Sequence, residues 1–138
     1  MTQKLTLSKK ERLKSRKLID RLFKSGPSLF SHPFKLLYLK DPHLEYEDIS
    51  ALDYPLLFSV TIPKKKIRSA AHRNLLKRRI REAFRLGKQP LQEKLINENV
   101  TICLMFIYIE NEEKDYAVIE KGITKLLKKL DEVIFPIS

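Results

Sequence analysis

The 138-residue chain has little of what most enzyme sites are built from. It contains only three glycines, too few for a glycine-rich loop that cradles phosphates. Its three histidines are scattered, and none stands at ligand spacing from the cysteine or a carboxylate, so no metal ligand is expected. No nucleophile paired with a base can be identified, and the acidic residues gather in segments that read as loops. We therefore expect no catalytic residue in this chain.

Long apolar segments and cysteine are scarce as well. The longest apolar run, residues 100–109, is about half as long as a helix that spans a membrane. Cys103 is the single cysteine, so an internal disulfide is excluded. Its position inside this apolar run favours a buried thiol over a nucleophile. The first residues include no apolar signal region. These absences predict a soluble protein that is cytoplasmic.

Positive charge, by contrast, is abundant and concentrated. Residues 64–88 carry eleven Lys or Arg residues and one acid, which is +10 of the chain's net +11. Ser69 is a suitable N-cap, residues 70–86 contain neither Gly nor Pro, and Gly87 provides a stop. The predicted helix has an apolar stripe and a polar face. The stripe is Leu76, Ile80, Ala83 and Phe84, and the polar face is Asn74, Lys77, Arg78, Arg81 and Arg85.

A charged helical face is most often simply solvated, so this alternative is weighed first. Solvated faces usually mix acids with bases, because like charges one turn apart repel by about 0.2–0.5 kcal/mol per pair. Here Lys77, Arg81 and Arg85 follow one another with little relief, and Arg outnumbers Lys in the helix. A guanidinium matches phosphate bidentately and stacks on bases. The pattern therefore favours a face that binds a polyanion.

The remaining segments predict an α+β sandwich, a small sheet covered by helices. Apolar residues make up 43% of the chain, enough for one core, so residues 1–138 are expected to form a single RNA-binding domain with 1–14 as a loosely ordered basic arm. Further helices are expected over residues 16–25 and 116–134, and residues 91–99 form a short helix or a loop. The expected strands are 34–40 (with Phe30 in the same strand or a separate one), 55–63, and 100–109, the last being central and buried on both faces. Residues 41–53 are expected to be a loop.

Aromatic residues accompany a second basic segment near the start of the chain. Residues 1–25 carry a net charge of +7, and a fold that joins them to residues 64–88 would create one basic surface. Single-stranded RNA is bound by basic residues together with aromatic rings on which bases stack. Each aromatic residue alone is more often part of the core, but as a group beside two basic segments they are candidates for stacking: Phe23, Phe30, Phe34 and Tyr38.

These motifs together resemble the protein subunit of bacterial ribonuclease P. The signature helix of that family is similar to Arg73-Asn74-x-x-Lys77-Arg78-x-Ile80-Arg81-Glu82-Ala83-Phe84. As in the family, it is preceded by Phe58-Ser59-Val60 and by a lysine-rich turn at residues 64–67. Further matching positions, which extend the resemblance from about residue 10 to the last helix, are Arg12-Leu13-Lys14, Leu22-Phe23-Lys24-x-Gly26 and Phe34.

The resemblance implies both a fold and a role. The family fold is α-β-β-β-α-β-α, like ribosomal protein S5 domain 2, with a left-handed βαβ crossover. Proteins of the family join a large catalytic RNA, and the complex removes the 5′ leader of precursor tRNA by Mg²⁺-dependent hydrolysis. The resemblance places the catalytic centre in the RNA, and places the Mg²⁺ on the RNA and the substrate rather than in a protein cage. It implies no further protein partner and no membrane.

Matching positions also imply which residues contact RNA. The signature helix would face the catalytic RNA and its metal-bound phosphates with Arg73, Asn74, Lys77, Arg78 and Arg81. A cleft between the sheet and a helix would hold the single-stranded leader, at or near Phe23, Phe34, Ser59, Lys65, Lys66 and Arg68. The basic and aromatic pattern adds Arg12, Arg16, Phe30, Tyr38 and Arg85 to the expected RNA-binding set.

The chain departs from the family pattern at a few positions. Leu75 stands where the family usually has an arginine, which removes one phosphate contact, and neighbouring Arg79 is a candidate substitute on another part of the helix. Ile19 stands where the family often has a second aromatic residue. Phe34 and Tyr38 are four residues apart and share one face of a strand, so the sequence leaves open which aromatic residue faces the cleft.

Other classes of protein remain as alternatives. A general RNA-binding protein, of the ribosomal or RNA-chaperone type, would show no preference for a tRNA leader. A DNA-binding regulator would need a helix-turn-helix, which the strand-like residues 55–63 before the basic helix argue against. A nuclease made of protein alone is the least favoured, because no cluster of carboxylates for two metal ions is evident.

Overall fold

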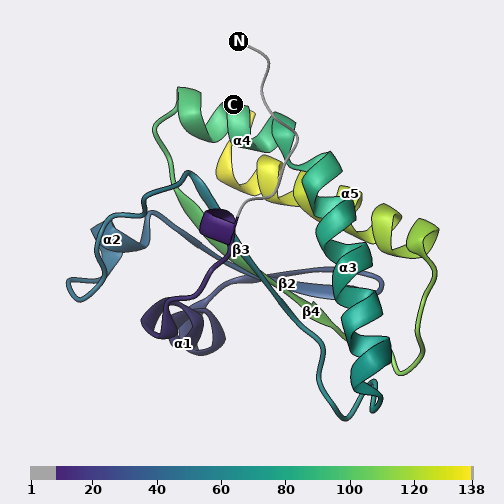
Figure 1. Cartoon of the computed structure of the whole chain (residues 1–138). Helices are drawn as coiled ribbons and strands as arrows, with labels where there is room; N and C mark the ends of the chain where they lie inside the picture. The colour runs from purple at the N-terminus through teal and green to yellow at the C-terminus, as the bar shows by residue number, and fades with distance from the viewer. Residues whose placement is uncertain (1–8, 138) are drawn as a thin grey trace.

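The computed structural model describes residues 9–137 (Figure 1). Four strands form one mixed sheet in the order β1-β2-β4-β3, in which β3 and β4 are parallel and the other neighbours antiparallel. Along the chain the elements are η1 (Lys9–Glu11), α1 (Arg16–Ser25), β1 (Ser28–Ser31), β2 (Phe34–Lys40), α2 (Pro42–Glu45), β3 (Leu56–Thr61), α3 (Ala70–Gly87), α4 (Gln89–Asn97), β4 (Ile102–Tyr108) and α5 (Tyr116–Ile134).

The central position of β4 confirms what its uninterrupted apolar run predicted. The strand lies between β2 and β3, and side chains on both of its faces are buried, Leu104 and Phe106 toward one side and Met105 toward the other. β3 is an edge strand, a position that suits the prolines Pro55 and Pro63 on either side of it. The sheet therefore has two covered faces and needs a layer of helix on each.

The two helical layers differ in size (Figure 1). α3 and α5 cover one face and enclose the larger core, into which the predicted stripe of α3 points; Phe84 of this stripe stacks on Phe58 with ring centroids 4.4 Å apart. α1 covers the other face through Leu18 and Leu22, which pack with Met105 and neighbouring residues. This arrangement confirms the α+β layout expected from the sequence.

Side-chain caps set the starts of the three longest helices. Ser15 accepts a hydrogen bond from the Leu18 N–H at 3.3 Å, and Ser69 accepts one from the His72 N–H at the same distance. The Asp115 carboxylate accepts from the Val118 N–H at 3.1 Å. The cap at Ser69 is the one that the sequence predicted, and all three satisfy N–H groups that have no partner within the helix.

The expected basic arm differs from the structure. Residues 1–8 lie outside the described residues, but residues 9–14 are attached rather than loose. The Leu13 N–H donates to the Phe58 carbonyl at 2.7 Å, and the Leu13 side chain is buried under α1. The Glu11 carboxylate pairs with Lys88 at 2.6 Å. The sequence did not predict these two contacts, because the segment is mostly basic and polar and both partners are distant in the chain.

The structure also resolves two alternatives that the sequence left open and adds one short helix. Phe30 belongs to a separate short strand, β1, and the segment expected to be a loop over residues 41–53 contains the single turn α2. The uncertain segment after the basic helix is helical, as α4. α3 and α4 connect the parallel strands β3 and β4, and the left-handed sense of that crossover stays a prediction. No helix within residues 9–137 is long and apolar enough to cross a membrane.

Candidate nucleic-acid interface

Two cations on the polar face of α3, Lys77 and Arg78, have no carboxylate partner among residues 9–137. Within the part of the chain that the structure describes, the side chains of Asn74, Lys77 and Arg78 have neither a hydrogen bond nor an ion pair. Asn74 and Arg78 are exposed and Lys77 is half-buried. Because Leu76 and Ile80 hold the opposite side of the helix against the sheet, these groups face away from the core. They are free to bind an external anion.

Two guanidinium groups from distant parts of the chain meet at the edge of β3. Arg12 is held beside Phe58 by a β-bridge, and with Ser59 and Arg81 it lines a small cavity of about 150 Å³. No carboxylate lines this cavity, and the Nε of Arg12 is buried without a hydrogen-bond partner. Burial, together with repulsion from Arg12, lowers the pKa of Arg81. An anion placed between the two would relieve both the repulsion and the unpaired donor.

Arg73 has a structural contact that the sequence did not reveal. Its Nη1 donates to the carbonyl oxygens of Ile67 and Arg68, each at 2.8 Å. These bonds hold the lysine-rich turn against the first turn of α3. Lys65 and Arg68 are exposed on that turn, and Lys66 is half-buried. Arg73 therefore positions other cations in addition to any contact of its own.

Arg85 differs from Lys77 and Arg78 because it is paired with a carboxylate. Its Nε and Nη2 donate to the two carboxylate oxygens of Glu82 at 3.1 and 2.6 Å. The hydrogen bond from Arg85 lowers the pKa of Glu82, and the same bond raises the pKa of Arg85. The free charge of the face is thus concentrated in the part of the helix before Glu82.

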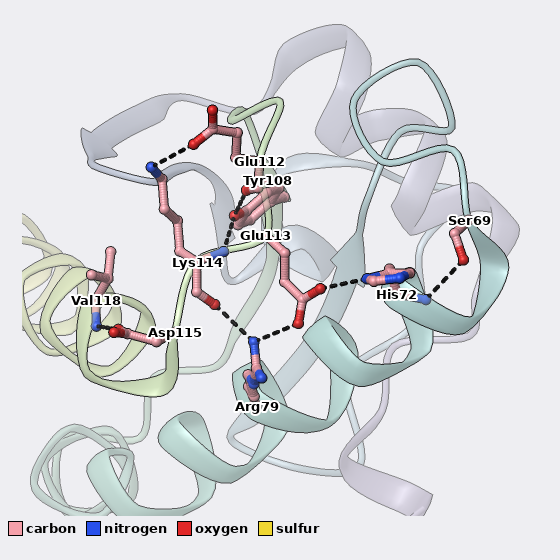
Figure 2. A network of polar contacts seen from close by, with 9 residues as sticks. All are labelled: Ser69, His72, Arg79, Tyr108, Glu112, Glu113, Lys114, Asp115 and Val118. Atoms are coloured by element: carbon pink, nitrogen blue, oxygen red, sulfur yellow. Dashed lines mark hydrogen bonds and ion pairs between the residues drawn. The ribbon is translucent and has the colours of Figure 1, made fainter.

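Arg79 does not take the place of the arginine that the family has at Leu75. Figure 2 shows its guanidinium pointing to the loop between β4 and α5, where Nη1 donates to Glu113 Oε1 and to the Lys114 carbonyl, both at 2.9 Å. His72 Nδ1 lies 2.5 Å from the other oxygen of Glu113, and the hydrogen bond with His72, with the charge of Arg79, lowers the Glu113 pKa. This network fastens α3 to the loop and sets the orientation of its free face.

Two of the aromatic residues expected to face a leader cleft are buried instead. Phe34 is 0% and Tyr38 9% exposed, and both belong to the core under α3 and α5. The expectation that either ring stacks on RNA is therefore wrong for this fold, since a buried ring cannot reach a base. Leu37, one residue before Tyr38, lies on the α1 side of the strand.

The α1 side of the sheet carries a row of partly exposed side chains, one from each strand. The strand register pairs Phe30 with Lys35, Lys35 with Ile107, and Ile107 with Thr61. Phe30 is 54% exposed, the Lys35 Nζ lies 5.7 Å from its ring centroid, and the other three are half-buried. We name these four residues the open row. The sequence reasoning missed Lys35, Thr61 and Ile107, although the two-residue period of strands gives the signal.

The remaining predicted residues lie on or near this side. Phe23 is 55% exposed on α1, and Arg16 is exposed at the start of that helix. Ser59 is half-buried and pairs in register with Met105, so it lies on the face that α1 covers. The face thus combines exposed aromatic rings with cations, which is the pattern of a surface for unpaired bases.

Residues 9–137 contain neither a cluster of metal-ligating side chains nor an exposed thiol. No group of three or more His, Cys, Asp or Glu side chains is placed to hold a metal ion in this range. Cys103 is buried, and burial raises its pKa to about 12, so the thiol stays protonated at neutral pH. It is a core residue, as its position in an apolar run indicated.

Comparisons with known proteins point to one family. Residues 7–131 match the family model described as Ribonuclease P. A protein of Porphyromonas gingivalis (strain ATCC 33277), named ribonuclease P protein component, is 32% identical over 124 residues, which cover 90% of this chain and 85% of that protein. The ribonuclease P protein component of Thermotoga maritima is 31% identical over 131 residues, covering 95% and 99%.

Solved structures agree with the sequence comparisons. The ribonuclease P protein from Thermotoga maritima superposes with a TM-score of 0.59 at 25% identity, covering 86% of this chain and 96% of the other. The RNase P protein of Staphylococcus aureus has a TM-score of 0.62 at 19% identity, covering 87% and 94%, which supports the fold.

Proposed function

Because the chain belongs to the ribonuclease P protein family and is a protein subunit of that tRNA-processing endoribonuclease, we propose that it contacts two RNAs through two faces. α3 and the Arg12–Arg81 cavity bind the catalytic RNA. The open row and Phe23 bind the single-stranded 5′ leader of precursor tRNA. The observation that carries this proposal is that the unpaired cations of α3 and the exposed aromatic rings lie on different elements, α3 on one side of the sheet and α1 and β1 on the other.

The α3 face suits a folded RNA because its cations are both fixed and unneutralised. The apolar stripe and the Glu113 network hold the helix, so Lys77 and Arg78 lose little freedom on binding. Arg12 and Arg81 offer two guanidinium groups to one anion, and a guanidinium binds phosphate bidentately. Phosphates of a structured RNA, held at fixed spacing, match such a rigid array of cations.

The open row suits a single strand because it alternates ring, cation and apolar surface. Exposed Phe30 offers a stacking surface to a base, and Lys35 beside it offers an ammonium group to the phosphate that follows. Ile107 and Thr61 extend the surface across the sheet. Base stacking on aromatic rings is tolerant of sequence, which fits leaders that differ from one tRNA to another.

The chemistry of leader removal is proposed to belong to the RNA. The two faces present ammonium and guanidinium groups, which repel Mg²⁺, and the carboxylates near them are engaged with Arg79 and Arg85. The described residues of the two faces therefore do not fit a protein-held Mg²⁺ ion, which prefers oxygen ligands. The protein's part is to position the RNA and the substrate and to offset phosphate repulsion.

Arg78→Ala and Arg73→Ala are both expected to weaken RNA binding, but only Arg73→Ala is expected to lower the stability of the protein as well. Arg78→Ala removes an unpaired cation, so the slope of log K against log salt for the catalytic RNA should fall by about 0.7–0.9 and the free energy of unfolding should stay the same. Arg73→Ala removes two hydrogen bonds to carbonyl oxygens and should also lower the free energy of unfolding by roughly 1.5–3 kcal/mol. Filter binding over a potassium chloride series measures the salt slope, and urea unfolding measures the free energy of unfolding. Identical behaviour of the two variants would contradict the assignment.

The proposal as a whole is tested by cleavage of a precursor tRNA at low Mg²⁺. A bacterial ribonuclease P RNA is assayed with and without the protein, and binding of precursor and mature tRNA to the complex is measured in parallel. Restored cleavage with tighter binding of the precursor is expected. Unchanged cleavage and equal binding of both tRNAs would instead indicate a general RNA-binding protein.

A further inference from the structure

A second basic cavity lies at the β1 edge of the sheet, opposite the β3 edge where the Arg12–Arg81 cavity lies. It has a volume of about 350 Å³ and lies between α5 and the turn that joins β1 to β2. We call it the α5 pocket, and it is lined by Ser31, His32, Lys114, Val118, Lys121 and Lys125. β1 and β3 are the opposite edges of the sheet, so this pocket is separate from the Arg12–Arg81 cavity.

The pocket exists because the β1–β2 turn packs directly on α5. Gly122 is buried, and a Cβ at this position would meet the His32 carbonyl oxygen at 2.6 Å and Pro33 Cδ at 2.9 Å. Only glycine permits this approach, which brings Ser31 and His32 beside the lysines of the helix. Farther along α5, the Lys129 Nζ donates to the Phe30 carbonyl at 2.6 Å and holds the end of β1.

Two of the lysines that line the pocket have no carboxylate partner among the described residues. Lys121 and Lys125 have no side-chain hydrogen bond or ion pair with any residue from 9 to 137. Three carboxylates are bonded to lining residues without lining the space themselves: Glu112 pairs with Lys114 at 3.6 Å, Glu110 with His32 Nδ1 at 2.9 Å, and Asp115 accepts from the Val118 N–H at 3.1 Å. Three ammonium groups, a hydroxyl and an imidazole thus surround a space without a lining carboxylate, a donor set suited to a phosphate group.

The position of the pocket next to the open row indicates where such a phosphate would come from. Ser31 and His32 follow Phe30 directly in the chain, and Phe30 is the outermost member of the open row. A strand that follows the open row and turns round the β1 edge would reach α5, which lies beside β1 on the other face of the sheet. We propose that the α5 pocket binds a backbone phosphate of the leader RNA where the strand leaves the sheet. This inference rests on the proposed leader contact and extends it to a longer stretch of the leader.

Lys125→Gln tests the pocket, and Lys128→Gln is its matched control. Both variants remove one charge from α5, but only Lys125 lines the pocket. Binding of the complex with bacterial ribonuclease P RNA is measured for precursor tRNAs with leaders of increasing length and for mature tRNA. For the longer leaders, Lys125→Gln should weaken binding about three- to fivefold near 0.15 M salt and reduce the salt slope by roughly 0.7. Mature tRNA and the Lys128→Gln complex should be unaffected.

Other outcomes separate the failure of this inference from the failure of the leader proposal. If Phe30→Ala reduces the preference for precursor while Lys125→Gln does not, the α5 pocket is not part of the leader path. If neither variant matters, the leader proposal fails as well. An inorganic phosphate titration that shifts the Lys125 amide resonance, with no effect of Lys125→Gln on any RNA, would assign the pocket to a free anion and overturn the inference.

Discussion

Lys88→Met is expected to lower the free energy of unfolding by about 3–5 kcal/mol, because it leaves a carboxylate without its partner inside the protein. Lys88 is 3% exposed, and its Nζ lies 2.6 Å from Glu11 Oε2. The bond joins η1 to the junction of α3 and α4, two segments 77 residues apart in the chain. Its loss should also release the segment that places Arg12 next to Arg81, and so weaken binding of the catalytic RNA.

A double variant separates the unpaired charge from simple loss of contact. In Glu11→Leu/Lys88→Met both charges are gone, and apolar replacement of a buried pair is often neutral in stability. Urea unfolding should therefore place the double variant much closer to the wild type than Lys88→Met alone. If the single variant is as stable as the wild type, the pair does not anchor residues 9–14, and the Arg12–Arg81 cavity must be held in another way.

Phe23→Ala/Phe30→Ala is expected to abolish most of the preference for precursor over mature tRNA. Stacking of a base on an aromatic ring contributes about 1–3 kcal/mol, so each ring that stacks accounts for roughly 5- to 150-fold in affinity. Both rings are more than half exposed, so the loss of stability on truncation should be small. The measurement compares the dissociation constants of precursor and mature tRNA with the complex of protein and ribonuclease P RNA.

The control for this variant is another exposed apolar side chain. Leu44 is 78% exposed on α2, away from the open row, and Leu44→Ala should leave both dissociation constants unchanged. Phe34→Ala is a poor test of the leader contact, because it removes a fully buried ring and would lower stability by about 3–5 kcal/mol. An equal loss of precursor and mature tRNA binding in Phe23→Ala/Phe30→Ala would show that the rings do not contact the leader.

Much of the fold could be predicted because its signals are local. The N-caps Ser15, Ser69 and Asp115 each act on an N–H three residues ahead, so their effect is visible in the sequence. The apolar stripe of α3 has a helical period, and its four residues are buried as expected. In the same way, the apolar composition of β4 was sufficient to predict a strand with both faces covered.

β2 shows where local pattern fails. Its residues are apolar on both faces, with Phe34, Leu36 and Tyr38 toward α3 and α5, and Leu37 and Leu39 toward α1. An alternation of apolar with apolar does not indicate which face a given helix covers. The assignment of Phe34 and Tyr38 to the leader was wrong for this reason. The packing of α1 on the opposite face shows that Lys35 and Ile107 lie on the side with the exposed aromatic rings.

The sequence by itself determined that this protein carries a concentrated positive charge on one helix and belongs among the protein subunits of ribonuclease P, since composition, helical period and motif spacing are properties of the chain. Tertiary structure decided which cations are free to bind RNA. Arg79 is neutralised by Glu113, 34 residues away, whereas Arg81 lies near another cation, Arg12, which repels it. Ion pairs form within a few ångströms, and those distances are set by how helices pack on the sheet rather than by neighbours in the sequence.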